Sequence, residues 1–267
     1  MNTPDTARKG RRTRIGEVVR ATRLTPNMQR VTLTGADLED FPPGQESAHI
    51  KFILPDSGQS RADFQAMLDD GRSKELRRRT YTVRHHRPDV NELDVDFVVH
   101  EGGGPACDWA LAAKPGAFIG IGGPGPKKAP NVVADWYAFG ADMSAIPAAA
   151  ACLEELPADA VGHAFFEILS EDDRQEVNAP AGIEIHWHVH SDVHAPNMKQ
   201  LEFFRSLDWS KGKAGVFVAG EGNCILALRK YLREDLGLDK REMYLSSYWI
   251  IGLAEDEHQV AKRAFAA

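Results

Sequence analysis

Arginine, tyrosine and threonine side chains alternate along one short stretch of the chain, LRRRTYTVRHH at residues 76–86. The β-branched and aromatic residues favour a strand, and the arginines offer cationic groups to an anion. On such a strand, Arg79 and Tyr81 share one face of the sheet. Thr80 and Thr82 then share the other face. A phosphorylated cofactor, a nucleic acid or a solvated strand end would each fit this pattern taken alone.

A glycine-rich turn followed by a helix signal lies at residues 94–110, DVDFVVHEGGGPACDWA. The strand is expected to end near His100, glycines 102–104 allow left-handed backbone, and Pro105 suits a first helical turn. Backbone N–H groups at such a helix start, together with the helix dipole, form a natural pyrophosphate site. An ordinary glycine-rich turn is the alternative. The pyrophosphate site is favoured over this alternative, because the arginine-containing strand and the helix start occur in the same half of the chain.

Histidines and cysteines are the other residues that could carry chemistry. The stretch HWHVHSDVH places His186, His188 and His190 on one strand face, with His194 nearby. Neutral imidazoles can bind zinc or nickel, but ligands at i, i+2 and i+4 on one flat strand seldom converge on one ion. We therefore predict no metal site there. The three cysteines are widely spaced and form no CxxC pair, which indicates a reducing compartment and no disulfide framework.

The elements that must position these residues differ between the two halves of the chain. Residues 14–125 hold short β-branched runs separated by Gly, Pro, Asp and Asn, the pattern of a small antiparallel barrel. A helical or irregular excursion at 62–78 and a short helix at 104–116 interrupt them. Farther along, strand-like and helix-like segments alternate and end in a helix at 255–266, which implies a parallel, doubly wound sheet. The expected units are a disordered tail at 1–12, a barrel domain at 13–128 and an α/β domain at 131–267.

Composition argues against several classes of function. The chain has 267 residues, of which 43% are hydrophobic and 27% charged, and its formal net charge is -7. An acidic body argues against nucleic-acid binding, which usually needs a broad basic face. No apolar run approaches the roughly 20 residues of a membrane-spanning helix, and no apolar segment follows the basic run RKGRRTR as it would in a secretory signal. We expect a cytoplasmic monomer without stable membrane insertion.

Three motifs, in this order, resemble those of the siderophore-interacting proteins, which are FAD-dependent ferric-siderophore reductases among the ferredoxin-reductase-like flavoproteins. They are RTYTVR at 79–84, DVDFVVH at 94–100 and GPACDWA at 104–110. The segments AHIKFILP, PGAFIGIGGPG, AGEGNCILALRKYLREDLGL and YLSSYWIIG are also similar to that family, so the resemblance runs from about residue 14 to residue 263. It implies FAD on the barrel and an α/β domain of the NAD(P)H-binding kind.

The resemblance also implies roles for individual residues. In these flavoproteins the arginine of the Arg-x-Tyr-Thr signature neutralises the flavin pyrophosphate, the tyrosine packs on the flavin, and the hydroxyl residue lies near flavin N5. The implied FAD-binding residues are Arg79, Thr80, Tyr81, Thr82, Asp96, Val98, His100, Pro105, Ala106, Trp109 and Trp249. Lysines at the cleft mouth are expected to attract an anionic ferric siderophore, and the candidates are Lys51, Lys127 and Lys128. Arg84 receives no role.

The loop implied for the nicotinamide nucleotide departs from the family pattern, which is commonly Gly-Asp-Glu-Thr-Ala-[apolar]-Pro-Ala. In GADMSAIPA, Met143 replaces the acidic residue and Ala141 replaces a glycine. Ile250 and Ile251 stand where a basic residue often follows the Tyr-Trp pair. No GxGxxG occurs in this half of the chain, which argues against a Rossmann dehydrogenase. Contacts with the nicotinamide nucleotide are expected from Gly140, Asp142, Ser144, Ala145, Glu167 and Glu221.

The resemblance implies reduction of ferric siderophores with release of Fe(II). NADH or NADPH would deliver hydride to flavin N5, or reduced ferredoxin would supply the electrons, and single electrons would then reach Fe(III). The flavin carries this chemistry beside Thr82, and no acid–base residue is required. A general flavin or ferredoxin-type reductase with a protein or free-flavin acceptor is the alternative. A non-enzymatic nucleic-acid-binding protein is a more distant one.

Overall fold

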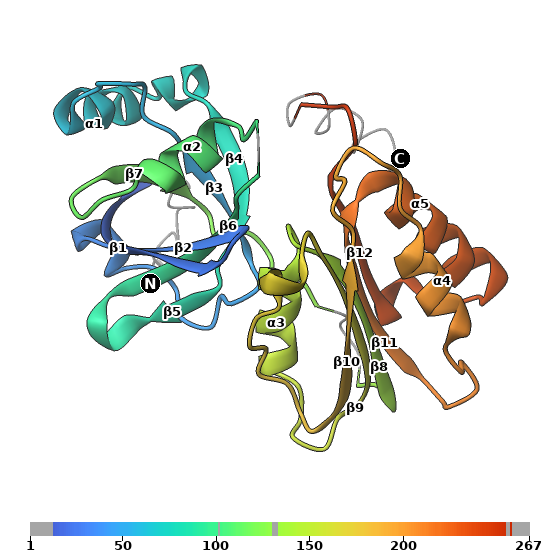
Figure 1. Ribbon diagram of the computed structural model, residues 1–267. Coiled ribbons are helices and arrows are strands. Elements are labelled where there is room, and N and C mark those ends of the chain that lie inside the picture. Colours follow the sequence, from blue (N-terminus) through green and yellow to red (C-terminus); the bar gives the residue numbers. More distant parts are fainter. Residues whose placement is uncertain (1–12, 101, 130–132, 255–256, 258–267) are drawn as a thin grey trace, which may run out of the picture.

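The computed structural model describes residues 13–100, 102–129, 133–254 and 257, and these form two lobes (Figure 1). The predicted tail at 1–12 and nearly all of the predicted helix at 255–266 lie outside the described residues. Within the described ranges, no helix is both long enough and apolar enough to cross a membrane. All three cysteines are buried and unpaired.

The N-terminal lobe is a curled antiparallel sheet of seven strands in the order β4-β3-β7-β1-β2-β6-β5. Its strands are β1 (Arg14–Thr25), β2 (Met28–Thr34), β3 (His49–Ile53), β4 (Arg78–Thr82), β5 (His85–Arg87), β6 (Glu92–Val98) and β7 (Phe118–Gly122). Two helices interrupt them, α1 (Arg61–Asp69) and α2 (Pro105–Ala112). Along β6, Val95 and Phe97 are fully buried in the lobe's core, because alternate side chains of a strand point to opposite faces. The predicted barrel-like domain is confirmed, with β4 and β5 as its two sheet edges.

The strand predicted across residues 78–86 divides into β4 and β5. The Val83 N–H donates to the Ala48 carbonyl at 2.9 Å, and the next residue, Arg84, donates to the Asp94 carbonyl at 2.9 Å. Two adjacent residues therefore bond to segments near opposite ends of the same sheet, beside β3 and in β6, and this brings the two ends of the curled sheet together.

The C-terminal lobe is a parallel sheet of five strands in the order β10-β9-β8-β11-β12. Its strands are β8 (Trp136–Asp142), β9 (Val161–Ile168), β10 (Gly182–Val189), β11 (Ala214–Glu221) and β12 (Met243–Trp249), and its helices are α3 (Ile146–Glu154), α4 (Lys199–Ser206) and α5 (Gly222–Lys230). Phe139 and Phe217 pack with α3 on one face, while Ala138 and Val216 pack with α4 and α5 on the other (Figure 1). This arrangement confirms the predicted α/β domain with a parallel sheet.

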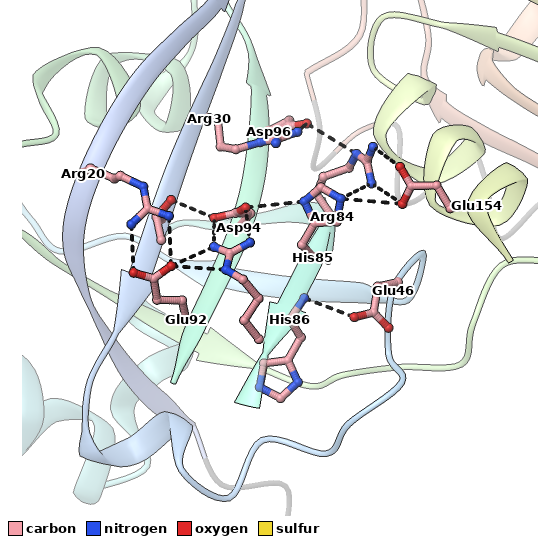
Figure 2. A network of polar contacts seen from close by, with 12 residues as sticks. Arg20, Arg30, Glu46, Arg84, His85, His86, Glu92, Asp94, Asp96 and Glu154 are labelled. Carbon is pink, nitrogen blue, oxygen red and sulfur yellow. Dashed lines mark hydrogen bonds and ion pairs between the residues drawn. The ribbon is translucent and has the colours of Figure 1, made fainter. Parts of the chain in front are cut away.

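Contacts between the lobes are both apolar and polar. Met28 of β2 is fully buried in an apolar cluster that includes most of α3. Asp173 is fully buried and accepts hydrogen bonds from the backbone and side-chain N–H groups of Asn27, both at 2.8 Å. Arg84 donates to both carboxylate oxygens of Glu154, at 2.9 and 2.7 Å (Figure 2). These contacts fix the barrel against the α3 side of the parallel sheet.

Candidate flavin and nicotinamide sites

Strand β4 presents the predicted flavin-binding residues on two faces. The Tyr81 ring centroid lies 5.3 Å from that of Phe52 and 4.3 Å from that of Phe97, so Tyr81 packs against the aromatic core of the barrel. Lys51 Nζ donates a hydrogen bond to Thr80 Oγ1 on the opposite face. The expected division of this strand into two faces is confirmed.

Arg79 and Thr82 differ in their exposure to solvent. Arg79 is half-buried, and its Nη1 donates to the Arg78 carbonyl at 2.7 Å. Thr82 is only 5% exposed and ends β4, just before the chain crosses to the other sheet edge. Arg79 is therefore a partly accessible cation on the Tyr81 face of β4, and Thr82 is a shielded hydroxyl at the end of the strand on the opposite face.

The first turn of helix α2 has no side-chain cap among the described residues, and there is free space beside its N-cap residue. Gly104 is its N-cap, no described side chain caps this helix start, and a Cβ at Gly104 would meet no atom within 4 Å. A Cβ at Gly103 would lie 2.6 Å from Cys107 Sγ, so this turn closes on the helix only without a side chain. Pro105 and Ala106, both predicted to bind FAD, lie in the first turn. Uncapped first-turn N–H groups with space around them suit a phosphate.

An aromatic cluster joins β4 to α2. The Trp109 ring lies 5.9 Å from Phe97 and 6.2 Å from Phe52, the same two rings that contact Tyr81. Phe52 is also the residue of β3 that pairs with Arg79 in the strand register. The cation, the aromatic wall and the helix start therefore lie on the same side of the barrel. These features fit a flavin dinucleotide, which needs charge for its pyrophosphate and apolar contact for its rings.

Three other residues predicted to bind FAD have different surroundings. The Asp96 side chain is 1% exposed and forms an ion pair with Arg30 at 2.7 Å (Figure 2). Val98 packs against the apolar cluster that holds Met28 between the lobes. His100 follows β6 and is exposed. Their roles toward a cofactor stay predictions.

The acidic residues predicted for the nicotinamide nucleotide meet at the carboxyl edge of the parallel sheet. Asp142 ends β8 and pairs in register with Glu167 of β9, and Glu221 ends β11. Ligands of open α/β sheets bind at this edge. Burial and the neighbouring Asp142 and Glu221 raise the pKa of Glu167 to about 8, so its carboxyl group is mainly protonated at neutral pH. Asn197 Nδ2 donates to Glu167 Oε2 at 2.6 Å.

The other two acidic residues, Asp142 and Glu221, also accept hydrogen bonds from the protein. Asp142 accepts from the Ser144 hydroxyl at 2.5 Å and from the Trp249 indole N–H at 2.7 Å. Glu221 caps α5 by accepting the Asn223 backbone N–H at 2.8 Å. Trp249, predicted to cover the flavin, therefore has its hydrogen-bond partner at the sheet edge, and its flavin contact stays a prediction.

Gly140 and Ala145 are buried beside this edge. A Cβ at Gly140 would lie 3.0 Å from Gln200 Oε1 and 3.0 Å from the Phe204 ring, so α4 packs directly on that backbone. Both residues shape the loop that carries Ser144, and their contact with a nucleotide stays a prediction.

The lysines predicted for substrate attraction differ in exposure. Lys127 is exposed and forms an ion pair with Glu155 at 2.5 Å. Lys128 is 6% exposed, and its Nζ lies 4.3 Å from the centroid of the Tyr248 ring. Lys51 is half-buried beside β4. Lys128 thus contacts the α/β lobe instead of presenting its charge to solvent.

Known protein families match the sequences of both lobes. The family model of the siderophore-interacting FAD-binding domain matches residues 17–128, and that of the siderophore-interacting protein matches residues 134–252. The chain belongs to the siderophore-interacting protein family. The first match identifies the barrel lobe as the FAD-binding domain of this family.

Relatives of this siderophore-interacting protein are similar over nearly their whole length. The chain is 35% identical over 256 residues to the ferric vibriobactin reductase ViuB of Vibrio cholerae, covering 92% of each chain. The crystal structure of the siderophore-interacting protein SipS from Aeromonas hydrophila superimposes with a TM-score of 0.83 at 32% identity, covering 96% of this chain and 98% of the other. Ferredoxin-NADP+ reductase from Plasmodium falciparum shares the fold, with a TM-score of 0.62 at 13% identity over 88% of this chain and 96% of the other. The predicted ferredoxin-reductase-like fold is confirmed.

Sequence reasoning missed the polar contacts that join the two lobes of this siderophore-interacting protein. Arg84, which received no role, binds Glu154, 70 residues away. Asp173 binds Asn27, 146 residues away. No motif or spacing rule relates residues so far apart, so the sequence offered no signal for either pair.

Proposed function

We propose that this protein is an FAD-dependent ferric-siderophore reductase that takes electrons from NADH, NADPH or reduced ferredoxin and releases Fe(II). The observation that carries this proposal is the combination of Arg79, Tyr81 and the open α2 start in a member of the siderophore-interacting family. When bound, FAD supplies acceptance of two electrons and their delivery one at a time. Hard oxygen donors hold Fe(II) less tightly than Fe(III), so reduction of the chelated ion releases it.

Each part of the proposed flavin site has a separate task. Arg79 and the first-turn N–H groups of α2 bind the pyrophosphate through charge and hydrogen bonds. Tyr81 and Trp109 form an apolar wall that excludes water from one side of the bound group. Thr82 offers a shielded hydroxyl to the flavin ring. No side chain has to move a proton for electrons to reach the iron, so we assign no catalytic base.

The nicotinamide nucleotide is proposed to bind at the carboxyl edge of β8, β9 and β11. The protonated Glu167 carboxyl can donate a hydrogen bond to a ribose or carboxamide oxygen. The Ser144 hydroxyl oxygen can accept one from a ribose hydroxyl, because its own proton is donated to Asp142. The carboxyl oxygens of Asp142 and Glu221 already accept hydrogen bonds from the protein, and neither side chain offers positive charge to a phosphate at this edge. We therefore expect the uncharged parts of the nucleotide to contact these residues and its phosphates to lie elsewhere.

Two lysines remain suited to attract an anionic chelate. Lys51 lies beside the proposed flavin residue Thr80, and Lys127 is exposed where the chain leaves the barrel. Their charges would raise the local concentration of an anionic siderophore and speed its association at low salt. Lys128 is assigned a supporting role, because it lies over Tyr248.

Anaerobic stopped-flow absorbance tests the proposed function directly. The FAD-loaded protein is reduced in turn with NADH, NADPH and reduced ferredoxin, and then mixed with a panel of ferric siderophores and with free flavin. We expect at least one donor to bleach the flavin and ferric siderophores to restore its absorbance. Rapid reoxidation by free flavin or a protein acceptor, with ferric siderophores inert, would establish the general flavin-reductase alternative. A protein that takes up no FAD would overturn the proposal.

A further inference from the structure

Three potential metal ligands, separate from the proposed flavin and nicotinamide sites, lie on the α4 face of the parallel sheet in the amino-terminal parts of β9 and β10. His163 of β9 pairs in register with Glu184 of β10, and His186 follows two residues later on the same face. His163 Nδ1 lies 3.3 Å from His186 Nε2. The Glu184 carboxylate oxygens lie 3.5 Å from the first nitrogen and 3.6 Å from the second. Three ligating groups from two strands therefore converge on one point.

These separations match the edges of a metal coordination shell. Ligands of a tetrahedral centre with bonds of about 2.0–2.1 Å are about 3.4 Å apart. Hydrogen bonds between nitrogen and oxygen span about 2.7–3.2 Å. Each Glu184 oxygen is therefore too far from its nearest ring nitrogen for an ordinary hydrogen bond, while one ligand atom from each of the three residues lies within 4.8 Å of the other two.

The surroundings hold the two rings while leaving the site accessible. The Phe203 ring of α4 lies 4.8 Å from His186 and 6.3 Å from His163. The side chains of His163 and His186 are 25% and 30% exposed, and that of Glu184 is 66% exposed. Burial and the neighbouring His186 lower the pKa of His163, which favours the neutral imidazole that a metal needs. The exposed Lys211 lines the same surface pocket as His163 and Glu184, and its positive charge disfavours the binding of a cation there.

We propose that His163, Glu184 and His186 bind a divalent first-row transition ion, with a fourth position left to water. Two imidazoles and one carboxylate suit zinc, cobalt, nickel and ferrous ions, whereas magnesium and calcium prefer oxygen ligands. The ion would tie the edge strand β10 to β9. Glu184 and His186 lie five and three positions before the carboxyl end of β10 at Val189, whereas Glu167 of the proposed nicotinamide site pairs with His188, one position before that end.

The structure also explains why the histidine pattern alone was misleading. The sequence predicted His186, His188 and His190 on one strand, but β10 ends at Val189, and His190 Nε2 lies 3.1 Å from the carbonyl oxygen of Ala195. The third ligand comes instead from the neighbouring strand, where His163 lies 23 residues from His186 in sequence. Only the register of β9 against β10 brings the three groups together.

Metal titration of the untagged, chelator-treated protein tests the site without any electron donor or siderophore. Zinc binding is measured by calorimetry and cobalt binding by visible absorption, and we expect one ion per chain with the spectrum of a tetrahedral cobalt site and no competition from magnesium. His163→Ala and His186→Ala should each weaken zinc binding by at least about tenfold, since even the loss of an outer-shell partner has that effect. Glu184→Gln should also weaken it.

Two further variants separate ligation from general effects on the strand. His188→Ala is the matched control, because His188 lies on the same face of the same strand but stacks on Phe165 at 5.8 Å, and its affinity should equal that of the wild type. Lys211→Gln removes the opposing charge and should tighten binding by about two- to fivefold. Zinc affinity that is unchanged in both His163→Ala and His186→Ala overturns the proposal, as does a loss in His188→Ala as large as theirs. Failure of the siderophore reaction would leave this result unaffected.

Discussion

The arginines around Tyr81 have different environments, although they are adjacent in sequence. Arg77 lies 3.8 Å from Asp56, and Arg78 donates to Ser73 at 2.8 Å. Within β4, only Arg79 shares a face with Tyr81. Of the clustered arginines, Arg79 is therefore the one that we propose binds the flavin pyrophosphate.

Replacing Arg79 by alanine is expected to weaken FAD binding. A hydrogen bond to a charged group contributes about 1.5–3 kcal/mol, so the dissociation constant should rise by about 10- to 100-fold. Fluorescence titration of the apoprotein with FAD measures the change. Arg78→Ala is the matched control, because its side chain is exposed and bonded to Ser73, and it should bind FAD like the wild type. Equal FAD affinity in Arg79→Ala and the wild type would refute the assignment.

The raised pKa of Glu167 predicts how the stability of the protein depends on pH. The folded protein keeps this proton up to about pH 8, whereas the unfolded chain releases it near the ordinary value of 4.5. Folding therefore takes up a proton between these values, and stability contributed by this site falls as the pH rises through the window. Glu167→Gln, which cannot ionise, should show a melting temperature that declines less between pH 5 and about pH 8. Differential scanning fluorimetry across that range measures it.

A control on the same face distinguishes the buried carboxyl from general charge effects. Glu202 of α4 is exposed and pairs with Lys199 at 2.6 Å. Glu202→Gln should retain the pH dependence of the wild type. If Glu167→Gln and Glu202→Gln give parallel curves, the shifted pKa of Glu167 is wrong.

At the scale of elements, the start of α2 carries the clearest prediction. Gly104 has an ordinary negative φ of -84°, and a Cβ there would meet no protein atom within 4 Å. Gly104→Ala should therefore leave the stability of the apoprotein nearly unchanged while its methyl group obstructs a phosphate at the first turn. We expect weaker FAD binding, measured by fluorescence titration, with an apoprotein melting temperature close to that of the wild type.

Gly103 provides the contrasting variant. A Cβ at this position would lie 2.6 Å from Cys107 Sγ and 3.1 Å from the His100 carbonyl, so Gly103→Ala should lower both apoprotein stability and FAD binding. Loss of stability in Gly104→Ala as large as that in Gly103→Ala would show that both glycines serve the fold alone. Full FAD affinity in Gly104→Ala would remove α2 from the flavin site.

Elements with a local signal could be predicted from the sequence, and pairings between distant segments could not. Period-two alternation around Tyr81 predicted the two faces of β4, and the run of glycines before Pro105 predicted the α2 start. The break at Val83 escaped prediction, because the sequence remains strand-like while the hydrogen-bond partner changes from β3 to β6. The metal-type cluster at His163 escaped it for the same reason, since its geometry depends on strand register.

At the scale of the whole molecule, a few polar contacts hold the barrel against the α/β lobe. Asp173 and Glu154 each receive hydrogen bonds from the opposite lobe, and Asp173 is fully buried. Electrons that enter at the proposed nicotinamide edge must reach a flavin on the barrel. The relative position of the lobes is therefore part of the proposed mechanism, and these contacts help to fix it.

The contribution of the Arg84–Glu154 ion pair to stability can be measured against that of an exposed ion pair by replacing two neighbouring glutamates, Glu154 and Glu155. Burial alone would raise the pKa of Glu154, but hydrogen bonds with His85 and Arg84 outweigh it and lower that pKa to about 2 (Figure 2). Glu154→Gln leaves the Arg84 side chain, only 6% exposed, without its bidentate carboxylate partner. We expect a loss of about 2–3 kcal/mol in the free energy of unfolding at pH 7, measured with urea.

Glu155→Gln is the matched control at the same helix end. Its carboxylate pairs with Lys127 at the surface, with both side chains partly exposed, so its loss should cost less than about 1 kcal/mol. Because the Glu154 carboxylate is stabilised relative to the unfolded chain, its contribution is fully present above about pH 4.5 and is lost as the pH falls toward 2. The difference between the wild type and Glu154→Gln should therefore shrink in acid. A difference that persists unchanged down to pH 2 would mean that the ion pair does not hold the lobes together.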